Sequence, residues 1–134
     1  MLTFLIFLSI FGLISATSQS VAATGTVLCN GKPVSDLRVK LYDKDAWTTD
    51  DKLAEVKTDN NGQFKISGTG QSDRKMMSKF NIYHRCGMGM KICWYKNSFD
   101  IPSTYVVNGG SNGKVYDAGR IELSQLTKDR DCFN

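Results

Sequence analysis

The sequence predicts an all-β sandwich of seven or eight strands that is stabilised by disulfides. Short segments in which apolar and polar residues alternate are separated by turns rich in Gly, Asn and Asp, a pattern typical of antiparallel sheets. The chain has four cysteines, all of which follow an apolar leader, so we expect two disulfides and an extracellular location. No internal repeat or long linker divides the rest of the chain, which indicates one domain.

Residues 1–16 have the features of a secretory signal peptide. Within them, residues 4–14 (FLIFLSIFGLI) carry no charge and form a run that is too short to span a bilayer but suits a signal peptide. Ala16 is a small residue suited to the position before cleavage, and Ala22 offers a second site. We prefer cleavage after Ala16 because a strand pattern starts near Ser20. The expected domains are a signal peptide at 1–16 and a β-sandwich at 17–134, secreted and without a transmembrane segment.

The clearest strand covers residues 37–42. Val39 and Leu41 face one way and the basic residues Arg38 and Lys40 the other, which fits a sheet with one packed face and one solvated face. An Asn-Gly pair precedes this strand and suits a turn with positive backbone dihedral angles.

A hairpin is predicted next. Residues 53–57 and 63–67 are its strands, and residues 58–62 (TDNNG) form its turn. The Asp opens such a turn, and Gly62 can adopt the left-handed conformation that is costly for other residues.

The second half of the chain continues the strand pattern. Serine and glycine at residues 67–72 predict a mobile connection, followed by at most a short helix at residues 73–79. Alternating residues then predict strands at 79–85, 92–101 and 114–123.

Several motifs occur in order along the chain: CNGKP at 29–33, VKLYD at 39–43, TDNNGQF at 58–64, NIYHRC at 81–86, YDAGRIEL at 116–123 and RDC at 130–132. In this ordered set the chain resembles the nematode transthyretin-like family, over nearly all residues after about Ser20. The resemblance implies a secreted, transthyretin/prealbumin-like β-sandwich. It also implies a mostly non-enzymatic extracellular role in signalling, carriage or recognition. It does not transfer hormone binding, because function resides in the site and not in the fold.

The four cysteines allow three disulfide pairings. We prefer Cys86 with Cys93 and Cys29 with Cys132, because the strands on either side of residues 86–93 bring the first pair together locally. Zinc binding by His84, Cys86 and Cys93 is an alternative, but the spacing matches no usual zinc pattern and an oxidising compartment favours disulfides. A calcium site is a second alternative, but the glycine and glutamate of a calcium-binding loop are missing. Its carboxylates would come from Asp43, Asp45, Asp50 and Asp51. We expect no metal or cofactor.

Catalysis is not expected. His84 is the only histidine, and no nucleophile motif accompanies it, so we expect a strand histidine that is hydrogen-bonded near a disulfide. The transthyretin-related hydroxyisourate hydrolases use several histidines and a C-terminal Tyr-Arg-Gly-Ser tail, whereas this chain ends in RDCFN.

The candidate binding residues are basic and methionine side chains in predicted loops. The net charge of +4 permits attraction to acidic surfaces but is too low and scattered to indicate nucleic-acid binding. Basic residues could converge on the exposed sheet face and contact an anionic lipid or an acidic receptor, and flexible methionines suit adaptable surfaces. The selected residues are Arg74, Lys75, Met77, Arg85, Met88, Met90 and Lys91.

The sequence therefore predicts a secreted binding or signalling protein that recognises a cell-surface receptor or an anionic lipid. The alternative is an extracellular carrier of a small hydrophobic ligand.

Overall fold

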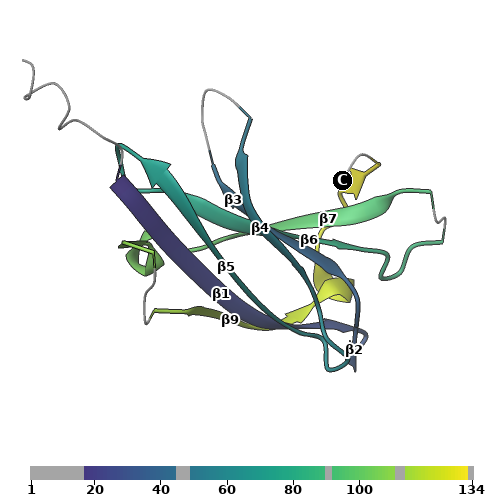
Figure 1. Ribbon diagram of the computed structural model, residues 1–134. Coiled ribbons are helices and arrows are strands. Elements are labelled where there is room, and N and C mark those ends of the chain that lie inside the picture. Colours follow the sequence, from purple (N-terminus) through teal and green to yellow (C-terminus); the bar gives the residue numbers. More distant parts are fainter. Residues whose placement is uncertain (1–16, 45–48, 90–91, 111–113, 133–134) are drawn as a thin grey trace, which may run out of the picture.

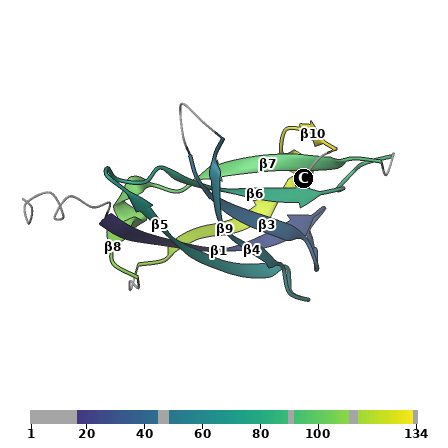
Figure 2. The same cartoon turned by 45° about the horizontal axis from the view of Figure 1, so that its top comes forward.

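The computed structural model describes residues 17–44, 49–89, 92–110 and 114–132, and these form two five-stranded sheets packed face to face (Figures 1 and 2). The all-β sandwich prediction is confirmed. The predicted signal peptide at residues 1–16 lies outside the described residues. In the part that is described, no helix is long and apolar enough to cross a membrane.

The first sheet is organised around one long strand. Strand β1 (Thr17–Cys29) pairs antiparallel with β2 (Lys32–Pro33), β5 (Gln63–Ser72) and β8 (Val107–Asn108), and parallel with β9 (Tyr116–Glu122). β1 therefore joins the N-terminal, central and C-terminal parts of the chain within one layer.

The second sheet has the order β10-β7-β6-β3-β4, and every pairing in it is antiparallel. Its strands are β3 (Arg38–Asp43), β4 (Asp51–Lys57), β6 (Ser78–His84), β7 (Trp94–Asp100) and β10 (Arg130–Asp131). Two short 3₁₀ turns are present. The first, η2 (Ser103–Tyr105), lies between β7 and β8, and the second, η3 (Leu123–Gln125), lies between β9 and β10.

The core lies between the sheets and is built from alternate residues of the facing strands. Phe80 on β6 contacts Phe64 on β5 and Phe99 on β7, with ring centroids 5.3 and 5.0 Å apart. Burying an apolar side chain of this size contributes about 1.5 to 3 kcal/mol, and the Phe64–Phe80 contact joins the two layers. The other buried apolar residues of the central strands include Val21, Ala23, Val27, Val39, Leu41, Ile66 and Ile82.

The predicted mobile connection at residues 67–72 is wrong. β5 continues to Ser72, because β1 extends back to Thr17 and supplies its hydrogen-bonding partner. The glycines here serve packing instead of mobility. A Cβ at Gly68 would lie 2.8 Å from the Leu53 Cβ, and one at Gly70 would lie 2.8 Å from the Met76 sulfur.

No helix forms at residues 73–79, where the sequence allowed at most a short one. The Gln19 side chain donates to the Arg74 carbonyl at 2.7 Å and accepts from the Met76 amide at 2.9 Å. These bonds take backbone groups that a helix would use, and they place Met76 in the core with 1% exposure. The segment therefore runs extended into β6.

Gly62 and Gly31 give a matched test of the packing at the hairpin turn. Both have positive φ, +74° and +78°, so alanine at either position costs about 1 to 2 kcal/mol of left-handed strain. A Cβ at Gly62 would also lie 2.5 Å from the Val27 carbonyl oxygen, whereas one at Gly31 meets nothing within 4 Å. We expect Gly62→Ala to lower the free energy of unfolding by roughly 1 to 3 kcal/mol more than Gly31→Ala, measured by urea denaturation. Equal losses would contradict this packing.

Candidate functional site

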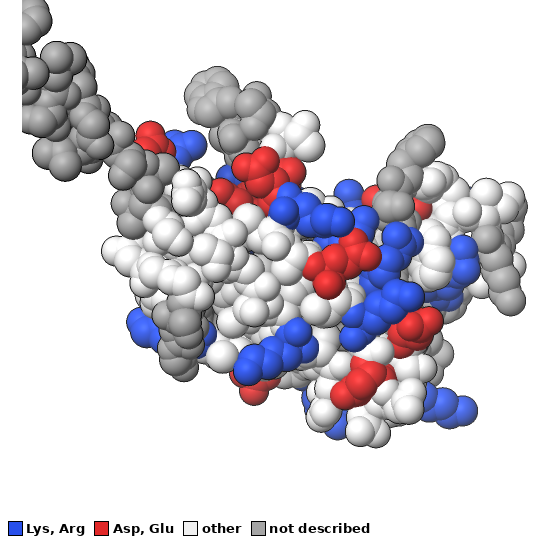
Figure 3. Space-filling view, viewed as in Figure 1, with Lys and Arg blue, Asp and Glu red and all other residues white. Residues whose placement is uncertain are grey.

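The outer face of the second sheet collects basic and aromatic side chains. Because successive residues of a strand point to opposite faces, burying Val39 and Leu41 turns Arg38 and Lys40 outward. The register places Arg38 opposite Tyr83, and Tyr83 opposite Lys96 on β7. In Figure 3, Lys and Arg gather with Asp and Glu over the part of the molecule where β4, β6 and β7 lie in Figure 1.

Aromatic rings hold these cations in place. The Arg85 guanidinium lies 3.6 Å from the centroid of the Trp94 ring, and Arg38 lies 5.7 Å from the same ring and 5.8 Å from that of Tyr83. The Lys40 ammonium lies 4.9 Å from the Tyr83 ring. Cation–π contacts of this kind are worth about 0.5 to 1 kcal/mol each at exposed sites and more when desolvated. We call this surface the basic–aromatic face, formed by Arg38, Lys40, Tyr83, Arg85, Trp94 and Lys96.

Carboxylates at the rim of this face neutralise part of its charge. Lys96 pairs with Asp131 at 3.8 Å, and the neighbouring Lys79 pairs with Asp50 at 2.9 Å. Such partly exposed pairs contribute little stability, and salt screens them. Lys40 forms no ion pair with a described carboxylate.

The structure separates the candidate binding residues predicted from sequence. Arg85 belongs to the basic–aromatic face, and Met88 is half-buried in the turn that follows it. Arg74 and Lys75 are exposed and line a different groove of about 500 Å³, and Met77 beside them is 61% exposed. These three precede β6 whereas Arg85 follows it, so the two groups lie at opposite ends of the strand.

Met90 and Lys91, also predicted, lie outside the described residues. Tyr83 and Trp94 are not among the binding residues predicted from the sequence. These two aromatic residues lie beside Arg38 and Lys40 only because the strands pair in this register. The sequence alone therefore gives no direct sign of the contact.

The preferred disulfide pairing is wrong. The structure joins Cys29 to Cys86, with Cα atoms 5.8 Å apart, and Cys93 to Cys132, with Cα atoms 4.4 Å apart. The β6–β7 ladder does bring residues 86 and 93 toward each other, but it stops at His84.

Two local features redirect the cysteines. The Cys86 amide donates to the His84 Nδ1 at 3.1 Å, which turns the chain toward the end of β1. β10, which the sequence analysis missed, pairs Asp131 with Trp94 and so places Cys132 next to Cys93.

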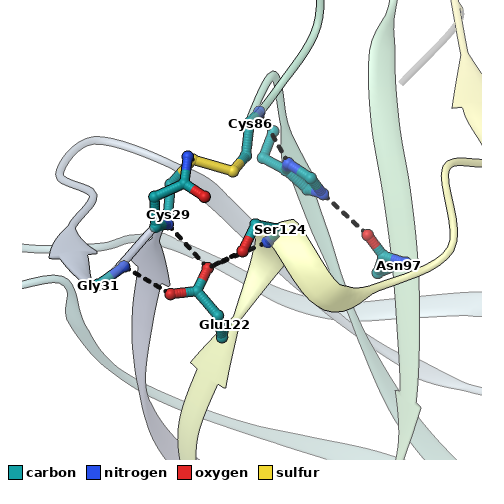
Figure 4. The surroundings of a disulfide bond; sticks show 8 residues. Cys29, Gly31, Cys86, Asn97, Glu122 and Ser124 are labelled. Carbon is teal, nitrogen blue, oxygen red and sulfur yellow. Dashed lines mark hydrogen bonds between the residues drawn. A yellow bond between two sulfur atoms is a disulfide. The ribbon is translucent and has the colours of Figure 1, made fainter.

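A glutamate stabilises the turn beside the first disulfide (Figure 4). The Glu122 carboxylate at the end of β9 accepts from the backbone amides of Asn30 at 2.9 Å and Gly31 at 2.6 Å. It also accepts from the Ser124 amide at 3.1 Å and hydroxyl at 2.7 Å. Asn30 and Gly31 both have positive φ, which points their amides at one acceptor. These hydrogen bonds, the one from Ser124 foremost, lower the pKa of Glu122 to about 2.

His84 has a structural position, as the sequence predicted. It is 2% exposed, its Nδ1 accepts from the Cys86 amide, and its Nε2 lies 2.8 Å from the Asn97 Oδ1 and therefore donates to it. Asn97 in turn donates to the Thr127 carbonyl at 2.9 Å. Burial lowers the pKa of His84, so the ring is neutral at neutral pH and both of its nitrogens are occupied.

The zinc alternative does not fit this arrangement. Cys86 and Cys93 belong to two different disulfides, so their sulfurs are not thiolate ligands. Among the described residues, no three metal-ligating side chains converge. Asp45, one of the residues of the calcium alternative, lies outside the described ranges.

The fold and the site together define a two-disulfide β-sandwich domain with a basic–aromatic sheet face. The model of the transthyretin-like family (TTR-52) matches residues 24–102, and the chain belongs to this family.

Similar proteins support the assignment over most of the chain. Transthyretin-like protein 5 of Caenorhabditis elegans is 41% identical over 94% of this chain and 92% of its own length. Transthyretin-like protein 33 of the same organism is 35% identical over 87% of this chain and 84% of its own length. Among solved structures, a 9R-lipoxygenase from Cyanothece is similar to 78% of this chain, with 16% of its own chain covered, 21% identity and a TM-score of 0.43.

Peptide mapping without reduction tests the disulfide pairing. Trypsin cleaves after Arg85, Lys91, Lys96 and Arg130, which releases CGMGMK, ICWYK and DCFN as separate peptides. We expect ICWYK to be linked to DCFN and CGMGMK to the peptide that contains Cys29, as found by mass spectrometry. A linked CGMGMK–ICWYK pair would show that the structure has the wrong pairing.

The low pKa of Glu122 predicts how stability depends on pH. A carboxyl whose pKa falls from 4.5 to about 2 on folding stabilises the protein fully above pH 4.5, and this contribution is lost as the pH falls toward 2. We therefore expect Glu122→Gln to be less stable than wild type at pH 6, and the two curves of urea midpoint against pH to converge as the pH approaches 2. Parallel curves from pH 6 to 2 would contradict the role given to this carboxylate.

Proposed function

We propose that this protein is a secreted, non-enzymatic binding protein that attaches to an anionic extracellular partner through the basic–aromatic face. The observation that carries the proposal is the convergence of Arg38, Lys40, Arg85 and Lys96 on one sheet face, where Tyr83 and Trp94 support them. The partner is an acidic receptor surface or an anionic lipid surface. Membership of the transthyretin-like family is consistent with a binding role.

The composition of the face suits a charged partner. A net charge of +4 is modest for the whole chain, so attraction to a surface depends on how the charges are concentrated. Stacking on Trp94 restricts the Arg85 guanidinium, so less side-chain freedom remains to be lost on binding. Tyr and Trp favour interfaces that are apolar on one side and wet on the other.

Two observations support an extracellular and non-catalytic role. Two disulfides are typical of an oxidising compartment. His84 is buried with both ring nitrogens in hydrogen bonds to protein groups, so it is poorly placed for acid–base chemistry on a ligand.

The carrier alternative has less support. Phe64, Phe80 and their neighbours fill the space between the sheets of one copy, so a hydrophobic ligand would need a channel between copies. Sedimentation that finds only monomer would remove this alternative.

Charge removal at the two ends of β6 tests the proposed face. We expect Arg38→Gln with Arg85→Gln to weaken attachment to vesicles of anionic lipid by roughly tenfold or more, since each basic residue at such a surface contributes about 1 kcal/mol. Arg74→Gln with Lys75→Gln removes the same charge at the other end of the strand and should bind nearly as well as wild type. Cosedimentation with vesicles at low and high salt measures the attachment of both double variants, and attachment should weaken as the salt concentration rises.

Equal weakening by the two pairs would contradict the assignment to this face. Attachment to intact cells separates the two partners, because protease treatment of the cells removes a protein receptor and leaves lipid in place.

A further inference from the structure

A pocket of about 270 Å³ opens on the outer face of the second sheet, within and beside the basic–aromatic face. It lies over β3, β6 and β7, which supply Lys40, Tyr42, Asn81, Tyr83 and Lys96 to its walls. Three of its side chains are ammonium groups, since Lys79 also reaches it.

Lys40 is the unusual member of this pocket. It is 9% exposed and lies 4.9 Å from the centroid of the Tyr83 ring. Glu55, its register partner on β4, is close enough to interact with it electrostatically but forms its ion pair with Lys52 at 3.1 Å. A largely buried lysine without a direct ion pair is costly, so a site that keeps one is suited to an added anion.

The charges of the pocket leave one cation in excess. Lys79 pairs with Asp50 and Lys96 with Asp131, and both carboxylates line the same pocket. The third ammonium, that of Lys40, has no such partner in the described part of the chain.

The hydroxyl groups point to the same conclusion. Tyr42 and Tyr83 line the pocket together, and the Tyr83 hydroxyl accepts from the Asn81 amide at 3.3 Å. Ser98 donates to the Asn81 Oδ1 at 2.6 Å and so fixes the orientation of that amide. A phenolic hydroxyl can donate as well as accept, so both tyrosines can offer a proton to a ligand in the pocket. Burial, with the neighbouring Tyr83 hydroxyl, raises the pKa of Tyr42, which keeps that hydroxyl protonated.

We propose that this pocket binds one phosphate group, which accepts hydrogen bonds from the Lys40 ammonium and from the hydroxyl groups of Tyr42 and Tyr83. The donors come from β3 and β6, and Lys is a common phosphate ligand that acts as a point charge. The inference deepens the proposed function and rests on it for the view that the phosphate belongs to an extracellular anionic partner.

Titration with inorganic phosphate tests the pocket directly. Binding is followed by amide chemical shifts of the oxidised protein at constant ionic strength, with chloride as the competing salt. We expect saturable shifts around β3 and β6 in wild type and roughly tenfold weaker binding in Lys40→Met, since a hydrogen bond to a charged group is worth about 1.5 to 3 kcal/mol. Lys57→Met is the matched control, because it removes one exposed lysine, outside the pocket, from the adjacent β4, and it should bind as wild type does.

A second variant protects the test against misfolding. Tyr83→Phe keeps the ring and removes the hydroxyl, so it should also weaken phosphate binding. No saturable binding by wild type, or equal binding by wild type and Lys40→Met, would overturn the pocket. Acetate should bind more weakly than phosphate, and equal affinity for the two would overturn the choice of phosphate.

The same variants separate this inference from the proposed function. If Lys40→Met attaches to anionic vesicles as well as wild type and phosphate does not bind, the pocket is wrong and the binding face remains. If phosphate binds through Lys40 but the protein attaches neither to vesicles nor to cells, the pocket is a site for free phosphate and the proposed attachment is wrong.

Discussion

Cys29 ends β1 in one sheet and Cys86 follows β6 in the other, so the bond between them fixes where the two layers meet. Closing a loop of this size is worth about 3 to 5 kcal/mol, a large share of the 5 to 15 kcal/mol that stabilises a typical domain. The Glu122 carboxylate and the His84 ring hold the chain on either side of this bond. The placement of the functional face depends on the same constraint.

Both disulfides adjoin the closest cation–π pair of that face. Arg85 precedes Cys86, and Trp94 follows Cys93, so each partner of the 3.6 Å contact is next to a cross-linked cysteine. The core fixes the remaining members through strand alternation, because burying Val39 and Leu41 turns Arg38 and Lys40 to the opposite face of the sheet. A surface assembled in this way is held by covalent bonds and packing instead of by its own weak ion pairs.

The strands could be predicted from the sequence, whereas the contacts between distant segments could not. Alternation gave β3, β6 and β7 to within a few residues, and the Asn30-Gly31 turn has the predicted positive φ. The disulfide pairing failed because it depends on the two-residue strand β10, which is too short to have a periodic signal. The basic–aromatic face was missed in part because Tyr83 and Trp94 meet Arg38 only through the register between strands. Residues 67–72 were misassigned because their glycines serve close packing, which the sequence does not distinguish from mobility.

The central claim is that the outer face of the second sheet contacts the partner. Hydrogen–deuterium exchange of the oxidised protein, free and bound to vesicles of anionic lipid or to cell membranes, tests it most directly. The account predicts added protection in and beside β6 and β7, at residues 78–85 and 94–100, with β1 and β5 unchanged. Protection centred on β1 and β5, or on the groove beside Arg74 and Lys75, would contradict it.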